Sequence, residues 1–180
     1  NNDGWTALIF ASGNSNVEIV SQLLDGGVDV NVINDNGVTA LLIASEDGHA
    51  EVVAQLLAAG ADVNASDNDG WTALLFVSMN GHAKVTAQLL AAGADVDASN
   101  NNGWTALLLA SLSGHVKVVG QLLAAGADVH ASNKYGGIGF LNISGAGQAE
   151  ILAKVLATAY VHALDKDGVT ALFVASKNGH

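Results

Sequence analysis

Apolar residues recur along the chain in pairs of short runs that are separated by polar turns. The first run of a pair is compact, as in residues 73–77, and the second has its apolar residues at helical spacing, as in residues 52–57. Asn-Gly or Asp-Gly precedes the first run, and this dipeptide tolerates the positive φ of a tight hairpin turn. A Thr able to cap a helix follows the turn, and a Gly able to end a helix follows each run. The pattern predicts a unit of turn, helix, turn and helix.

This unit repeats along the chain with a fixed period. Trp-Thr-Ala-Leu begins at Trp5, Trp71 and Trp104, and Val-Thr-Ala-Leu begins at Val38 and Val169. The first four copies are 33 residues apart (38 − 5, 71 − 38, 104 − 71), and the last follows after 65, which leaves room for one irregular unit. Such units bury a continuous core only by stacking. We predict one domain, residues 1–180, with units 1–33, 34–66, 67–99, 100–132 and 133–164 and a partial unit 165–180.

The repeated unit resembles the ankyrin repeat. The third unit, from Asp67 to Val96, follows the family pattern nearly throughout. The resemblance implies an all-α solenoid of stacked helix-turn-helix units joined by hairpin turns, and a protein that binds other proteins without chemistry of its own. The family usually has Thr-Pro-Leu-His at the first helix, whereas this chain has Ala at the Pro position and Ile, Leu or Phe at the His position. Stability must therefore depend more on apolar stacking.

The fifth unit departs furthest from the pattern. Ile138 replaces the capping Thr, Gly139 replaces Ala, Asn142 takes an apolar position and Gln148 replaces His. We predict that this unit is the least stable and that the array bends or opens there.

Charge and composition narrow the choice of partner. Seventeen acidic residues against six Lys and no Arg give a formal net charge of −11. Nucleic acid and anionic membrane surfaces both require a cationic face, so we expect neither as a partner. The chain has no Cys, hence no disulfide and no thiolate metal site, and we expect no cofactor. The compartment is undecided; a cytoplasmic location is favoured over an extracellular one, which stays open.

A Ser lies four residues before a His in several units, and this pair invites a catalytic interpretation. An active site is normally built once, whereas the pair recurs with the period of the fold. The resemblance implies that His bonds neighbouring loops. The histidines of neighbouring units are too far apart to bind one metal ion together. Packed helices are roughly 8–10 Å apart, whereas the ligands of a zinc ion lie about 2 Å from it. We therefore predict no enzyme and no metal site. The pairs are Ser45 and His49, Ser78 and His82, Ser111 and His115, and Ser176 and His180.

A stack of units presents its hairpin tips and the exposed side of its first helices as one continuous concave surface. We predict that a protein partner binds there, and the acidic and amide tips favour a basic one. Large aromatic rings are the usual anchors of such interfaces. Two alternatives stay open: the Trp rings pack on neighbouring units, and the acidic tips form a solvated rim. The predicted binding residues are Trp71, Trp104, Tyr135, Asp69, Asn102, Met79 and Leu112; Asn68, Asn80 and Asn101 share the face as positions not needed for packing.

The ends of the array suggest an alternative function. Neither end has the polar cap that a free solenoid needs. Val17, Val20 and Leu24 make the first unit as apolar as the interior ones, and Leu172 and Phe173 lie in a last unit without a second helix. Either the chain is part of a longer array, or copies stack head to tail through these residues into a filament.

Two asparagines are candidates for modification. Asn64 lies in a segment similar to the ankyrin segment that is hydroxylated on Asn in some hosts, and Asn31 occupies the equivalent position one unit earlier. The resemblance therefore implies a possible hydroxylation at either residue.

Overall fold

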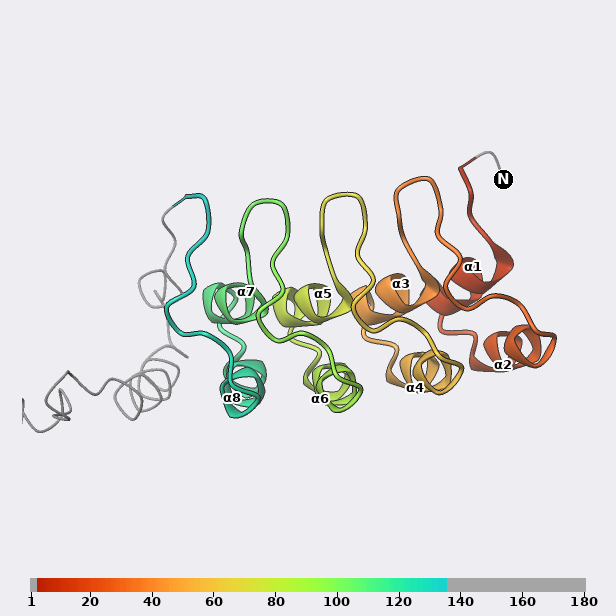
Figure 1. The fold of residues 1–180 in the computed structure, drawn as a ribbon. Helices are drawn as coiled ribbons and strands as arrows, with labels where there is room; N and C mark the ends of the chain where they lie inside the picture. Colours follow the sequence, from red (N-terminus) through yellow and green to blue (C-terminus); the bar gives the residue numbers. More distant parts are fainter. Residues whose placement is uncertain (1–2, 136–180) are drawn as a thin grey trace, which may run out of the picture.

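A computed structural model describes residues 3–135, which form eight α-helices in two parallel rows (Figure 1). One row holds the first helix of each unit and the other holds the second, and the hairpin loops all project from the same side (Figure 1). The predicted all-α solenoid is confirmed for these residues. The partial unit and all but residues 133–135 of the fifth unit, with the predicted bend, lie outside the described residues. The first row is α1 (Ala7–Gly13), α3 (Ala40–Glu46), α5 (Ala73–Asn80) and α7 (Ala106–Leu112), and the second is α2 (Val17–Asp25), α4 (Ala50–Ala58), α6 (Ala83–Ala91) and α8 (Val116–Ala124).

Each helix of the first row begins at a Thr cap, as the sequence predicts. Thr72 has extended backbone (φ −93°, ψ 165°), and its Oγ1 accepts a hydrogen bond from the Leu75 N–H at 3.4 Å. Thr6, Thr39 and Thr105 make the same bond at 3.1 to 3.3 Å. The cap satisfies a backbone donor that would otherwise have no partner at the helix start.

The turn between the two helices of a unit needs glycine for two reasons. Gly81 has φ +79°, a left-handed conformation that L side chains rarely adopt. A Cβ at Gly81 would also lie 2.6 Å from the ring of His115 in the next unit. The first unit is the exception, because Ser15 takes this position with φ +57°. The first unit therefore carries backbone strain that the glycines of its neighbours avoid.

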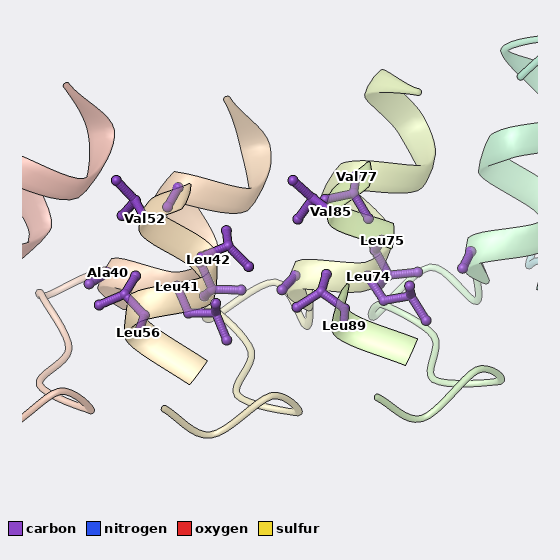
Figure 2. Close-up of a cluster of buried hydrophobic side chains, with 14 of the residues drawn as sticks. Ala40, Leu41, Leu42, Val52, Leu56, Leu74, Leu75, Val77, Val85 and Leu89 are labelled. Atoms are coloured by element: carbon purple, nitrogen blue, oxygen red, sulfur yellow. The ribbon is translucent and has the colours of Figure 1, made fainter. Parts of the chain in front are cut away.

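The core is a series of leucine layers between the helices. Leu41, Leu42 and Leu56 of the second unit are almost completely buried, as are Leu74, Leu75 and Leu89 of the third (Figure 2). Burying one such side chain contributes about 1.5 to 3 kcal/mol. First helices pack on first helices of the next unit and second on second, so each layer closes only when a neighbouring unit is present.

Histidine connects each unit to the one before it. The Nε2 of His49 donates to the carbonyl oxygen of Gly13 at 3.0 Å, and that of His82 donates to Glu46 at 2.9 Å. His115 Nε2 bonds the Met79 oxygen in the same way at 2.9 Å. A carbonyl oxygen only accepts, so Nε2 must carry the proton. The predicted structural role of these histidines is confirmed.

Two glutamines provide a second connection that the sequence analysis missed. Gln88 Nε2 donates to the Ala50 oxygen, and Gln121 Nε2 donates to the Ala83 oxygen, each at 3.0 Å. These bonds join neighbouring helices of the second row. Their signal in the sequence is a Gln at the same place in four successive units, which are Gln22, Gln55, Gln88 and Gln121.

Removing two hydroxyls of the third unit should change stability in opposite directions. Ser78 is fully buried and its Oγ has no hydrogen-bond partner, so Ser78→Ala should stabilise the fold by about 1 kcal/mol. Thr72→Ala removes a bonded cap and should destabilise it by about 1 kcal/mol. Urea unfolding of both variants measures this; a destabilised Ser78→Ala would contradict the burial of an unpaired hydroxyl.

Glycine at position 15 should stabilise the first unit. Ser15→Gly relieves a left-handed serine and should raise the free energy of unfolding by about 1 kcal/mol. Gly81→Ala is the opposite control, because it adds a Cβ against His115 at a positive φ. Thermal unfolding should therefore show a higher midpoint for Ser15→Gly and a lower one for Gly81→Ala. An unchanged or lower midpoint for Ser15→Gly would show that the turn is not strained.

Candidate functional site

The hairpin tips and the accessible positions of the first-row helices form the candidate binding surface, which we call the tip face. Backbone bonds hold successive tips in a row: Asn68 N–H donates to Asn36, Asn101 N–H to Asp69, and Lys134 N–H to Asn102, each at 3.0 Å. The tips therefore project as one ordered surface rather than as separate loops. The tip face comprises Asp35, Glu46, Asp47, Asp69, Trp71, Met79, Asn102, Trp104, Leu112 and Tyr135.

Four of the predicted binding residues are exposed on this face. Tyr135 and Leu112 have 74% and 50% of their surface exposed, which is high for large apolar side chains. Asp69 and Asn102 are exposed at the tips of the third and fourth hairpins. None of these four side chains is needed to fill the core, so all are available for contact with a partner.

The other three predicted residues are divided between core and surface. Trp71, Trp104 and Met79 are half-buried and pack against the core. The ring of Trp71 stacks on Phe76 of its own unit, with centroids 5.1 Å apart and an interplanar angle of 26°. The Trp71 ring therefore packs at least in part on its own unit. Packing of the Trp rings on a neighbouring unit and a role in partner binding both stay predictions.

Three asparagines of the same face hold the units together, and the expectation that they are not needed for packing is wrong. Asn68 Nδ2 donates to the Asp35 oxygen at 3.0 Å, and Asn101 Nδ2 donates to the Asn68 oxygen at 3.2 Å. Asn80 Nδ2 donates to the Glu46 oxygen at 2.8 Å. Each amide satisfies a carbonyl of the preceding unit.

Negative charge gathers on the part of the tip face that the second and third units form. Partial burial raises the pKa of Glu46, and the neighbouring charges of Asp47 and Asp67 raise it further. The second unit has no Lys or Arg, and the one Lys of the third unit, Lys84, lies on α6 in the second row. The His49 imidazole, which is cationic only when protonated, lies 4.0 Å from Asp47. This part of the face therefore holds excess negative charge.

The Ser and His pairs do not form an activated nucleophile in the described units. The hydroxyls of Ser45, Ser78 and Ser111 are buried without a hydrogen-bond partner. A catalytic pair requires the nucleophile within hydrogen-bond reach of its base. Residues 3–135 hold no group of three or more His, Asp or Glu placed to bind a metal ion. No helix in that range has the length and hydropathy to cross a membrane.

The residues of the first unit that were predicted for end-to-end assembly are not all accessible. Val17 and Leu24 are half-buried, but Val20 is fully buried, so its assignment to an exposed end surface is wrong. Val20 aligns with Val53 of the next unit, which is also fully buried. Ile19, which the prediction left out, is 48% exposed. Leu172 and Phe173 lie outside the described residues.

The two candidate modification sites bridge neighbouring hairpins. Asn31 Oδ1 accepts a hydrogen bond from the Asp62 N–H, and Asn64 Oδ1 accepts one from the Asp95 N–H, each at 2.8 Å. Both side chains belong to exposed residues. Hydroxylation of either stays a prediction.

Comparison with known proteins agrees with this geometry. A family model described as ankyrin repeats (3 copies) matches residues 1–67 and again residues 43–133. No curated protein matches the chain. Ankyrin repeats generally mediate protein–protein interaction, and members of the family are typically non-catalytic scaffolds. Because the matched residues coincide with the stacked units and span most of the sequence, the chain belongs to the ankyrin repeat family.

Proposed function

We propose that this protein is a non-catalytic scaffold that binds a protein partner on the tip face. The observation that supports this most is the exposure of Leu112 and Tyr135 on a surface whose backbone is already fixed. A preorganised surface loses little entropy on binding, so exposed apolar side chains on it can contribute fully to affinity. Affinity capture followed by mass spectrometry identifies the partner.

The partner that fits this face best carries basic residues and at least one large apolar side chain. Glu46, Asp47 and Asp69 make the second and third units acidic, whereas Leu112 and Tyr135 make the far part of the face apolar. The acidic residues lie in the second and third units and the apolar ones in the fourth and fifth, so the two parts are one to three units apart. Each unit adds roughly 8 to 10 Å, the distance between packed helices. A basic partner is favoured because complementary charge speeds and orients association.

Truncating the apolar residues should weaken binding without loss of folding. Leu112→Ala and Tyr135→Ala together should raise the dissociation constant of the captured partner by at least about tenfold, because each loses an interface anchor of about 1 kcal/mol or more. Their thermal midpoint should not change. Val28→Ala is the matched control, since Val28 is 41% exposed and follows α2, in the second row of helices.

The aromatic residues separate binding from packing. Trp71→Ala should lower the thermal midpoint because it removes the stack on Phe76, and the triple change of Trp71, Trp104 and Tyr135 to Ala should abolish capture. Full affinity in the variant lacking the Leu112 and Tyr135 side chains would contradict binding on the tip face.

Reversing charge on the acidic part should weaken association in a salt-dependent way. Glu46→Lys with Asp47→Lys should slow association with the captured partner several-fold at low salt, and the difference should shrink as ionic strength rises. Glu18→Lys with Glu51→Lys is the control, because these exposed residues make the same charge change on the second-row helices. An equal effect of both pairs would indicate only a response to net charge.

A second candidate function is assembly of copies end to end. The observation that favours it is Ile19, which is 48% exposed, although the aligned Val52, Val85 and Val118 are at most 1% exposed. Light scattering and electron microscopy of the purified protein test it. A species that stays monomeric at high concentration would remove this candidate.

A further inference from the structure

Asn-Gly dipeptides are places where an asparagine side chain loses its amide easily, because glycine has no Cβ to shield its backbone nitrogen. Three of them lie in the part of the chain that the structure describes: Asn36-Gly37, Asn80-Gly81 and Asn102-Gly103. In this reaction the glycine nitrogen attacks the asparagine Cγ, ammonia leaves and a cyclic succinimide forms. Water then opens the ring to aspartate or isoaspartate. The reaction therefore depends on how firmly the fold holds the glycine nitrogen and the asparagine amide.

The fold holds both reacting groups of Asn80-Gly81. The Asn80 amide donates to the Glu46 oxygen at 2.8 Å, and the Gly81 N–H donates to the Val77 oxygen at 2.9 Å. Asn80 is also the last residue of α5. Deamidation at this site would have to break both bonds and open the end of a helix.

Only one of the two groups is bonded in Asn36-Gly37, but the site is crowded. The Gly37 N–H donates to the Asn34 oxygen at 2.9 Å, whereas no hydrogen bond among residues 3–135 holds the Asn36 amide. Gly37 is buried, and a Cβ there would lie 2.8 Å from the side chain of Asn68 in the next unit. The neighbouring hairpin therefore restricts movement of this glycine.

Asn102-Gly103 is the most open of the three sites. The described part of the chain makes no hydrogen bond to the Asn102 amide. Gly103 is only half-buried, and the nearest atom to a Cβ there would be the Asn133 Cα at 3.2 Å. The Asn68 amide braces the second hairpin, but Lys134 takes the corresponding place after the fourth hairpin and has no amide.

We propose that Asn102 is a deamidation site of the folded protein and that local opening of the fourth hairpin controls its rate. The Gly103 N–H donates to the Asn100 oxygen at 2.8 Å, and this bond must break before the nitrogen can lose its proton and attack. The Asn102 N–H donates to the Asn100 Oδ1 at 3.0 Å and keeps the turn closed. Loops open locally at a lower free-energy cost than the core, so this step can occur while the rest of the stack stays folded.

The fold accepts the aspartate that the reaction produces. Asp69 takes the same place one unit earlier, where its N–H donates to Asp67 Oδ1 and its carbonyl oxygen accepts from the Asn101 N–H, each at 3.0 Å. Asn102 makes the two equivalent bonds at the same lengths. The aspartate product therefore keeps the tip in place, whereas isoaspartate, with its longer backbone, would displace it.

Deamidation adds a negative charge to the tip face. Asn102 lies in the fourth unit, beside the acidic part that the second and third units form. A basic partner would then associate faster with the deamidated protein, because complementary charge speeds association. This consequence rests on the proposed binding at the tip face, whereas the deamidation itself does not.

The first test follows the full chain at mildly alkaline pH by peptide mapping with mass spectrometry, which measures each site separately. In the folded protein Asn102 should deamidate fastest, Asn36 more slowly and Asn80 slowest. In guanidinium chloride this order should disappear, because each site is then an Asn-Gly dipeptide in an unfolded chain. No deamidation at Asn102 in the folded protein, or a rate at Asn36 or Asn80 that equals or exceeds it, would overturn the proposal.

The second test changes the residue that closes the fourth hairpin. Asn100→Ala removes the acceptor of the Asn102 and Trp104 N–H groups, and it should raise the rate at Asn102 by about tenfold or more. Asn100→Asp is the matched control and should leave the rate nearly unchanged, because Asp67 makes the same two bonds one unit earlier. An unchanged rate in Asn100→Ala, or an equal rise at all three Asn-Gly sites, would overturn control by local opening.

The third test measures the consequence for binding. Asn102→Asp should speed association with the captured basic partner several-fold at low salt. Asn64→Asp is the matched control, because Asn64 is exposed outside the tip face and Asp97 already holds the equivalent place. If Leu112→Ala with Tyr135→Ala weakens binding but Asn102→Asp has no effect, binding on the tip face stands and the proposed effect of deamidation on it is overturned.

Discussion

Stacking of one unit on the next is the interaction on which the rest of this structure depends. A pair of helices of seven to nine residues cannot bury its own apolar surface, and isolated helices of this length are marginal in water. The leucine layers close only when a neighbouring unit covers them (Figure 2). The ordered row of tips follows from this dependence on a neighbour.

Polar bonds determine how the units stack, and the apolar layers supply most of the energy. Histidine, glutamine and asparagine side chains each donate to a backbone carbonyl of the preceding unit, as His82 and Asn80 both do to Glu46. Each of these side chains bonds one particular carbonyl of the preceding unit, so the bonds define the register between units. They also occupy side chains that would otherwise be free to act on other molecules. We propose that the surface left for function is the tip face.

Much of the fold could be predicted because its signals are local and repeat. Thr72 caps a helix and Gly81 adopts a left-handed turn, and equivalent residues do the same in the other regular units. The candidate site could be predicted only in part. Whether Trp71 packs or binds depends on its stack against Phe76, and whether Asn68 is free depends on a carbonyl in the preceding unit. Helical spacing placed Val20 on the wrong surface, because spacing alone does not say which neighbour covers which side of a helix.

The central claim is that the stack supports a partner-binding tip face and that the second-row helices only complete the core. Hydrogen–deuterium exchange of the protein with its captured partner tests this most directly. The account predicts new protection in the tips and first-row helix ends of residues 35–47, 68–80 and 101–113, with little change in α4, α6 and α8. Protection confined to α4, α6 and α8, with the tips unchanged, would contradict it.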